Sequence, residues 1–273
     1  MSMKPPCAVI LARGLGTRMR RAEQAEGVGE EQQRIADIGV KAMIPIGRPF
    51  LDFVLSALAD AGVREVCLVI GPEHDIVRRH YTETSVPTRV SVKFAVQEKP
   101  LGTADAVTAA ASIVGHDDFL VLNSDNYYPV GAFRALVEMR GAGLVAFERD
   151  AMVRESNVQA DRIRQFAVVR IAPDDSLIEV IEKPDEATLA SFGDEVFVSM
   201  NCWRFTHDVL EACRRVVPSK RGELEIPDAV RLAQREGGVR FAVARMRAGV
   251  LDLSSRGDIS NVAGRLAHIQ VTP

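Results

Sequence analysis

The chain has 273 residues, of which 47% are hydrophobic and 26% charged, enough apolar material for one large α/β domain. With 34 basic and 37 acidic residues the net charge is −3, which gives no overall attraction to nucleic acid or to an anionic membrane. The four cysteines show no C-x-x-C spacing, which excludes a disulfide scaffold and a zinc finger. The apolar run 7–12 is too short for a signal-peptide core, and no window approaches the roughly 18 apolar residues of a membrane span. We therefore expect a soluble cytoplasmic protein.

Short apolar runs alternate with helical patterns through the first half of the chain. The runs are rich in β-branched residues, as in a parallel sheet that helices cover on both faces. Among the helices, 51–61 is placed to end at Gly62, and 104–114 has Thr103 available as its N-cap. This alternation predicts a Rossmann-like doubly wound sheet with right-handed crossovers. The predicted strands are 7–12, 66–70, 90–96 and 119–122, and a third helix is predicted over 130–139.

The second half is richer in predicted strands. Two of them, 165–171 and 177–181, are joined by the turn 172–176. No Pro/Gly/Ser-rich linker divides the halves, so we expect a β-rich elaboration of the same mixed sheet. The prediction is one domain over 1–273, with halves at about 1–150 and 151–273. The other predicted elements are a strand over 196–205, a helix opening at Thr206, a helix over 227–236 and a strand over 240–244.

The segment 20–39 is polar and charged and carries three glycines. Long segments without a periodic apolar pattern are often functional loops in compact domains. We predict a mobile loop here, either a solvated one or a flap that closes over a ligand.

The strongest local motif follows the first predicted strand and reads Gly14-Leu-Gly-Thr-Arg-Met19. Its glycines let the backbone approach a ligand closely, and the N–H groups of such a turn can bind phosphate oxygens. Arg18 adds a planar set of donors. Met19 stands where a dinucleotide fingerprint needs its third glycine, which disfavours a dinucleotide-dependent dehydrogenase, and no Walker A motif occurs. The motif predicts an anion-binding loop, with an ordinary strand–helix turn as the alternative.

Three further polar positions follow in the sequence, two of them at the ends of predicted strands. Lys41 is the one basic residue in an apolar stretch, and alone it is more typical of a solvated edge than of an anion site. Gln97 begins a segment that connects a strand to a helix, where ligands bind in open parallel sheets. Asp125 follows another strand, where it is either a turn residue or, next to phosphates, a magnesium ligand.

Together these motifs resemble the sugar-1-phosphate nucleotidyltransferases, or NDP-sugar pyrophosphorylases, over about residues 7–260. The pattern is similar to that of the glucose-1-phosphate thymidylyl- and uridylyltransferases. One such motif could arise by chance, whereas the whole series in the family's order could not. The motifs are Gly14–Met19, Lys41, 97–107, Asp125, Glu182-Lys-Pro184, Gly222-Glu-Leu-Glu-Ile-Pro-Asp228 and Leu251-Asp-Leu253.

The resemblance implies a role for each matching position. The loop would hold the triphosphate of a nucleotide, two residues would meet its base, and two carboxylates would share Mg²⁺. A further set, which makes up the sugar-binding part of the second half, would hold the sugar phosphate. The implied residues are Gly14, Gly16, Thr17, Arg18 and Lys41 for the triphosphate, Gln97 and Gly102 for the base, Asp125 and Asp252 for the metal, and Glu182, Lys183, Ala167 and Asn201 for the sugar phosphate. Arg18, Lys41, Asp125 and Lys183 form the implied catalytic set, and Glu223 matches a motif without an assigned contact.

Four positions depart from the family's pattern. Arg13 stands where the family usually has Ala, and Val40 replaces a Pro. Ser124 and Ala167 occupy positions that are usually Gly. The implied charges all remain, so the departures indicate an unusual sugar or nucleotide, or an inactive relative.

The implied activity joins a nucleoside triphosphate to a sugar 1-phosphate, with Mg²⁺ as cofactor and pyrophosphate as the second product. The substrates are then the partners, without nucleic acid or membrane, and a homo-oligomer is possible. The Gln97 amide can both donate to and accept from uracil or thymine, so dTTP or UTP is favoured. The alternatives are a mannose-1-phosphate guanylyltransferase-like enzyme and a catalytically idle regulatory relative that binds a nucleotide or sugar phosphate.

Overall fold

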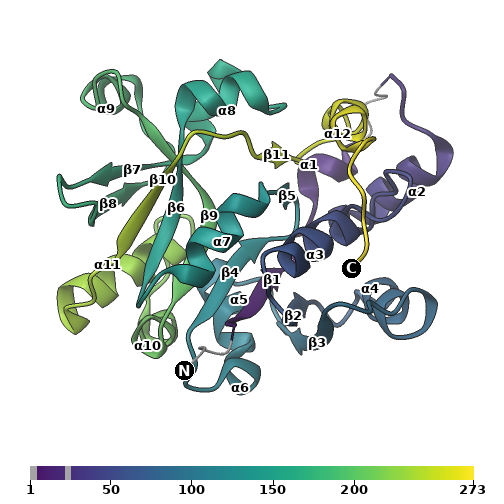
Figure 1. Ribbon diagram of the computed structural model, residues 1–273, viewed down its shortest axis with the longest axis horizontal. Coiled ribbons are helices and arrows are strands. Elements are labelled where there is room, and N and C mark those ends of the chain that lie inside the picture. Colours follow the sequence, from purple (N-terminus) through teal and green to yellow (C-terminus); the bar gives the residue numbers. More distant parts are fainter. Residues whose placement is uncertain (1–4, 22–25) are drawn as a thin grey trace.

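The computed structural model describes residues 5–21 and 26–273, and Figure 1 shows helices packed around one large mixed sheet. The strand order is β10-β6-β9-β4-β1-β2-β3, and β7 and β8 extend the sheet beside β9. The strands are β1 (Cys7–Leu11), β2 (Glu65–Ile70), β3 (Ser91–Val96), β4 (Phe119–Asn123), β6 (Gly143–Glu148), β7 (Ala167–Ile171), β8 (Leu177–Ile181), β9 (Phe197–Phe205) and β10 (Ala242–Met246).

Strands β1, β2, β3 and β4 run parallel to one another, with β1 between β2 and β4. The chain therefore crosses to one side of β1 and then to the other, which leaves a crevice beyond the carboxyl ends of these strands. Strand β9 runs antiparallel between β4 and β6, and β10 is parallel to β6. A strand from the second half of the chain is thus built into the sheet of the first half.

Alternate residues of β1 enter the two cores of the molecule. Ala8 and Ile10 face a core with α3 (Phe50–Asp60), α7 (Val130–Glu138) and α12 (Asp258–Leu266), whereas Val9 faces the opposite core. That second core includes α5 (Thr103–Ala109), α10 (His207–Arg215) and α11 (Ile226–Gly237). A sheet that is covered on both faces explains why its strands read as nearly continuous apolar runs. The predicted doubly wound α/β fold is confirmed.

Most predicted element boundaries agree with the structure to within two residues, and the differences are informative. Strand β6 is not predicted, because its run of four apolar residues is short and lies among glycines and charged residues. The predicted helix over 104–114 is divided into α5 and α6 (Ala111–Val114). Gly102, not Thr103, is the N-cap of α5, and the Thr103 hydroxyl accepts a hydrogen bond from the Ile226 N–H at 3.0 Å instead. The N-cap prediction is therefore wrong, because a distant helix uses that hydroxyl.

The loop prediction for 20–39 is wrong over α2 (Glu30–Ile38), and residues 22–25 of that segment lie outside the described part of the chain. The Gln32 side chain accepts from the Gly29 N–H at 2.9 Å and closes the helix N-terminus. Only Ile35 and Ala36 of α2 are buried. A helix with such a narrow apolar face has too little periodicity to be recognised from its sequence.

The remaining elements are short. Strands β5 (Asn126–Tyr127) and β11 (Leu251–Asp252) form a separate antiparallel ribbon next to the main sheet. Within the described ranges, no helix is long and apolar enough to cross a membrane. The other helical segments are α1 (Thr17–Arg20), α4 (Asp75–Arg79), α8 (Arg149–Glu155), α9 (Glu186–Ala190), η1 (Lys41–Met43), η2 (His80–Thr84) and η3 (Ala160–Gln165).

Candidate active site

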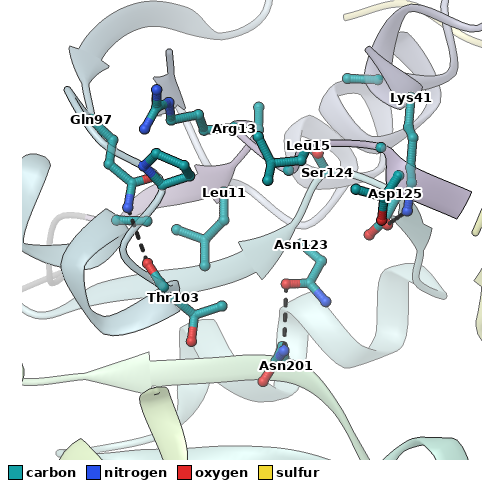
Figure 2. A pocket seen from close by; sticks show the side chains of 18 of the residues that line it. Leu11, Arg13, Leu15, Lys41, Gln97, Thr103, Asn123, Ser124, Asp125 and Asn201 are labelled. Atoms are coloured by element: carbon teal, nitrogen blue, oxygen red, sulfur yellow. Dashed lines mark hydrogen bonds and ion pairs between the residues drawn. The ribbon is translucent and has the colours of Figure 1, made fainter. Parts of the chain in front are cut away.

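A cleft of about 490 Å³ opens where β1, β3 and β4 end (Figure 2). It lies at the crevice that the strand order creates, which is the expected place for a ligand in this type of sheet. Most of the predicted nucleotide-site residues come together on its walls, although they are far apart in the sequence. Predicted residues that line the cleft are Gly14, Gly16, Thr17, Arg18, Lys41, Gln97, Gly102, Asp125 and Asn201, together with Glu223.

The glycine loop, Gly14–Met19, packs against the C-terminal end of α2. Gly16 has φ +60°, and a Cβ on this residue would overlap the backbone of Gly39. The Arg20 guanidinium donates to the Ile38 carbonyl oxygen at 2.6 and 3.0 Å. Met19 is fully buried. Only a glycine at position 16 allows this close approach. The segment predicted as a mobile loop therefore includes residues that support the glycine loop.

Lys41 and Asp125 form an ion pair on one wall of the cleft. The Lys41 Nζ donates to Asp125 Oδ2 at 2.7 Å, and the two side chains are 16% and 23% exposed. Lys41 begins η1, and Asp125 follows β4. The lysine is therefore not a solvated edge residue, and its partner reaches the surface of the cleft only in part.

Gln97 lies at the end of the cleft opposite Lys41 (Figure 2) and is 5% exposed. Its Nε2 donates to the Gly102 carbonyl oxygen at 3.1 Å and to Asp105 Oδ2 at 2.7 Å. Both hydrogens of the amide are thereby used within the protein. The side-chain oxygen is the group that remains for a ligand, so Gln97 offers an acceptor and not the donor–acceptor pair that the sequence suggests.

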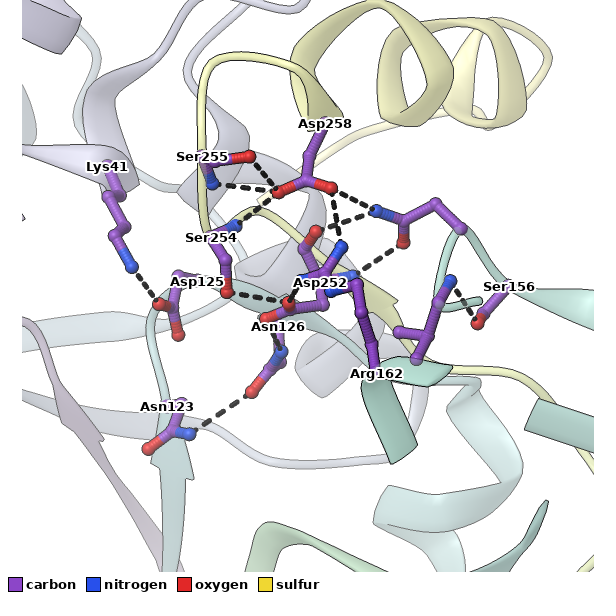
Figure 3. A network of polar contacts seen from close by, with 12 residues as sticks. Lys41, Asn123, Asp125, Asn126, Ser156, Arg162, Asp252, Ser254, Ser255 and Asp258 are labelled. Carbon is purple, nitrogen blue, oxygen red and sulfur yellow. Dashed lines mark hydrogen bonds and ion pairs between the residues drawn. The ribbon is translucent and has the colours of Figure 1, made fainter. Parts of the chain in front are cut away.

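Asp252 belongs to a buried polar network behind Asp125 (Figure 3). It lies opposite Asn126 in the β5–β11 ribbon and is 3% exposed. Its carboxylate accepts from Asn126 Nδ2 at 3.0 Å, from Ser254 Oγ at 2.6 Å and from Arg162 Nη2 at 2.7 Å. Burial raises the pKa of Asp252, and the charge of Asp125 raises it further. The two predicted metal carboxylates are thus close enough to interact, but Asp252 already has three donors.

The predicted sugar-phosphate residues gather around β7, β8 and β9. Ala167 pairs with Ser199 in the sheet, and Glu182 directly follows β8. Asn201 lines the cleft. Ala167, Glu182 and Lys183 are not among the residues that line it. Burial raises the pKa of Glu182, and the nearby charge of Glu225 adds to this shift.

Two arginines that were not predicted interact with these predicted site residues. Arg221 donates to Glu225 at 2.8–3.0 Å, and its charge acts on Glu182. The signal for Arg221 is its position directly before the Gly222 motif. Arg162 contacts Asp252 from 90 residues away, and nothing in the local sequence marks it.

The carboxylates of the cleft do not form a complete metal cage. Within residues 5–21 and 26–273, no group of three or more His, Cys, Asp or Glu side chains is placed to hold a metal ion. Mg²⁺ commonly binds through one or two carboxylates together with substrate phosphates. Asp125, which lies beside the glycine loop, suits that mode.

Comparisons with known proteins agree with this geometry. The family model described as nucleotidyl transferase matches residues 34–253. The chain is similar to UTP--glucose-1-phosphate uridylyltransferase AglF of Haloferax volcanii, with 27% identity over 84% of this chain and 84% of the relative. It is 29% identical to a glucose-1-phosphate thymidylyltransferase of Streptomyces griseus, over 82% of this chain and 56% of the relative.

A solved structure of UDP-glucose pyrophosphorylase complexed with UDP-glucose has the same fold. Its TM-score is 0.72 at 15% identity, with 96% of this chain and 98% of that chain covered. The chain spans about half the length of several of the curated relatives that it matches.

Proposed function

Since the chain belongs to the nucleotidyl transferase family, we propose that it transfers a nucleotidyl group from a nucleoside triphosphate to a sugar 1-phosphate. The products are an NDP-sugar and pyrophosphate, and the favoured donors are dTTP and UTP. Residues 1–273 act as one nucleotidyltransferase domain, in which about 1–150 bind the nucleotide and about 151–273 the sugar phosphate. The position of β9 between β4 and β6 supports this single unit, because a strand of the second half separates two strands of the first.

The triphosphate binds along the glycine loop. Backbone N–H groups from Gly14 to Thr17 contact its oxygens, and Arg18 and Lys41 balance its charge. The base lies toward Gln97 and Gly102. The observation that carries the proposal is the cleft itself, because it gathers the loop, the lysine, the glutamine and Asp125 at one sheet edge.

The reaction needs positioning and charge more than proton transfer. A phosphate monoester has its second pKa near 6, so the attacking oxygen of the sugar phosphate is largely ionised at neutral pH. It attacks the α-phosphorus in line while pyrophosphate leaves from the opposite side. Cationic side chains bring the two polyanions together, and one such contact is worth on the order of 3 kcal/mol in the transition state, or roughly a hundredfold in rate.

Magnesium is the proposed cofactor, and Asp125 fits it better than Asp252 does. Asp125 lines the cleft and has Lys41 as its ion-pair partner, whereas Asp252 is held by Arg162 and by two neutral donors. The resemblance assigns both carboxylates to the metal. When bound, Mg²⁺ would stabilise the charge on the α-phosphate.

The sugar phosphate binds where β7 begins and β8 ends, next to the middle of β9. Lys183 holds its phosphate and Glu182 the sugar hydroxyls, with Ala167 and Asn201 on the neighbouring strands. The ladder supports this grouping, because Ala167 pairs with β9 and lies one residue beyond the Val168–Ile181 pair that leads to Glu182. Arg221 adds a positive charge close to Glu182.

The test is a matrix of five nucleoside triphosphates against a panel of sugar 1-phosphates, scored by pyrophosphate release with Mg²⁺. Turnover with a dTTP or UTP pair is expected, and Asp125→Ala nearly abolishes it. Turnover confined to GTP and mannose 1-phosphate would favour the guanylyltransferase alternative. If no pair turns over, the idle-relative alternative replaces this proposal, and normal rates from Asp125→Ala would contradict its metal role.

A further inference from the structure

Arg13 is a buried cation whose hydrogen bonds are largely unused. It follows β1 at the start of the glycine loop, and its side chain is 7% exposed. Its Nη2 donates to Glu73 Oε2 at 3.5 Å, the limit of a hydrogen bond. Among the residues that the structure describes, Nε and Nη1 are buried without any partner.

This arrangement does not satisfy the guanidinium within the protein. An arginine stays charged at every accessible pH, so it cannot lose its proton when buried. Glu73 is 48% exposed, and water therefore screens its attraction for the guanidinium. Buried donors in native proteins nearly always have partners, and an exception calls for an acceptor from elsewhere. Arg13 also lines the cleft, so a bound ligand can supply that acceptor.

The position of Arg13 points to the base end of the cleft. The guanidinium lies against Gly71 and Glu73, in the turn after β2. Since β2 lies between β1 and β3, the side chain extends from the phosphate loop toward Gln97, which follows β3. Figure 2 shows Arg13 and Gln97 on the same wall. That wall offers the cationic donors of Arg13 and the acceptor oxygen of Gln97.

We propose that Arg13 selects the nucleobase of the bound triphosphate, by donating to a base carbonyl while the Gln97 oxygen accepts from the adjacent N–H. Uracil, thymine and guanine each carry a carbonyl next to a ring N–H. Adenine has no carbonyl, and its exocyclic amine would face the cation with a second donor. The pair therefore favours UTP, dTTP and GTP over ATP. This inference rests on the proposed function only in that the cleft binds a nucleoside triphosphate.

The inference is tested by nucleotide binding, measured by calorimetry with Mg²⁺ present. The ligands are UTP, dTTP, GTP, ATP and inorganic tripolyphosphate, and the proteins are wild type, Arg13→Ala, Arg13→Gln and Glu73→Gln. Wild type should prefer the carbonyl bases over ATP. In both Arg13 variants UTP, dTTP and GTP should bind about 10- to 100-fold more weakly, which is the effect of losing a charged hydrogen bond. The affinities for ATP and tripolyphosphate should change less than about twofold.

Glu73→Gln is the matched control, because it breaks the same ion pair and leaves the guanidinium in place. It should bind the carbonyl bases at least as well as wild type. An equal loss for tripolyphosphate would make Arg13 a phosphate ligand, and equal behaviour of Glu73→Gln and Arg13→Gln would make it a structural residue. Either result, or a wild type without base preference, overturns the inference.

The proposed function fails separately. A wild type that binds nucleotides with the expected preference but releases no pyrophosphate overturns the transferase activity and leaves the role of Arg13 standing. A wild type that binds no nucleoside triphosphate overturns both.

Discussion

Replacing Arg162 by methionine should destabilise the fold strongly, because this side chain neutralises two buried carboxylates. Arg162 donates to Asp252 Oδ2 at 2.7 Å and to Asp258 Oδ1 at 2.8 Å, and the side chains of these acids are 5% and 9% exposed. Removing one partner of a buried ion pair costs about 3–5 kcal/mol. Arg162 itself is 20% exposed, which places the expected loss near the lower end, at about 3 kcal/mol.

Thermal and chemical unfolding in EDTA measure this loss, with metal excluded so that it does not change the charge of the site. For a chain of this length, about 3 kcal/mol corresponds to a fall in Tm of roughly 6–12 °C. Asp252→Asn in the Arg162→Met background should recover about 1–2 kcal/mol, because it removes one of the two charges left without a cation. Arg164 is exposed in the same 3₁₀ segment, so Arg164→Met is the control and should change stability by less than about 0.5 kcal/mol.

The reasoning is refuted if Arg162→Met unfolds within 2 °C or so of the Arg164→Met control. It is also refuted if the effects of Arg162→Met and Asp252→Asn simply add, because contacting residues of one network must show a coupling energy. Either result would mean that water or a movement of the 160–165 segment compensates the carboxylates.

Three other substitutions test the glycine loop and the proposed sugar-phosphate site separately. Gly16→Ala should lower stability by about 2 kcal/mol or more, because it combines positive φ with overlap against Gly39, whereas Gly14→Ala, which has open space, should leave Tm unchanged. Glu182→Gln should raise Tm at neutral pH yet reduce turnover. Burial raises the pKa of the Glu182 carboxyl, so the stability of the wild type falls as the pH rises from the ordinary glutamate pKa through the pKa in the folded protein. The uncharged amide removes that loss of stability. Lys183→Ala should raise KM for the sugar 1-phosphate by roughly a hundredfold while calorimetric NTP affinity stays within about threefold.

The parts of the fold that could be predicted from the sequence are those in which burial leaves a clear apolar pattern, either a continuous run or a helical spacing. Strand β1 and helix α3 are almost entirely buried. Strand β1 therefore appears in the sequence as a short continuous apolar run, and α3 as a longer one in which Leu51, Val54, Leu55 and Leu58 keep a helical spacing. Helix α2 buries only Ile35 and Ala36, and its charged remainder has the composition of a loop. Such an element depends on tertiary packing, here against the glycine loop, and that packing is not written in its local sequence.

The candidate site divides in the same way. Gly14 and Asp125 follow from motifs near strand ends, and Lys41 from its place in an apolar stretch; the structure brings all three to one cleft. Their pairing could not be predicted, since the Lys41–Asp125 bond joins residues 84 positions apart. The use of the Gln97 amide is equally hidden, because it depends on where the next helix places Asp105.

A net charge of −3 does not show how the cations in and behind the cleft are paired. Lys41 and Arg162 each pair with a carboxylate, but the two pairs differ in their access to a ligand. An incoming triphosphate can compete with Asp125 for Lys41 on the wall of the cleft, and this exchange leaves the carboxylate available without burying a new charge. The Arg162–Asp252 pair lies deeper, and both Asp252 oxygens have other donors, so exchange there would break a network of several bonds. The difference in burial therefore makes Asp125 the carboxylate on which a metal site can be built at the lower cost, whereas Asp252 remains part of the buried network behind it.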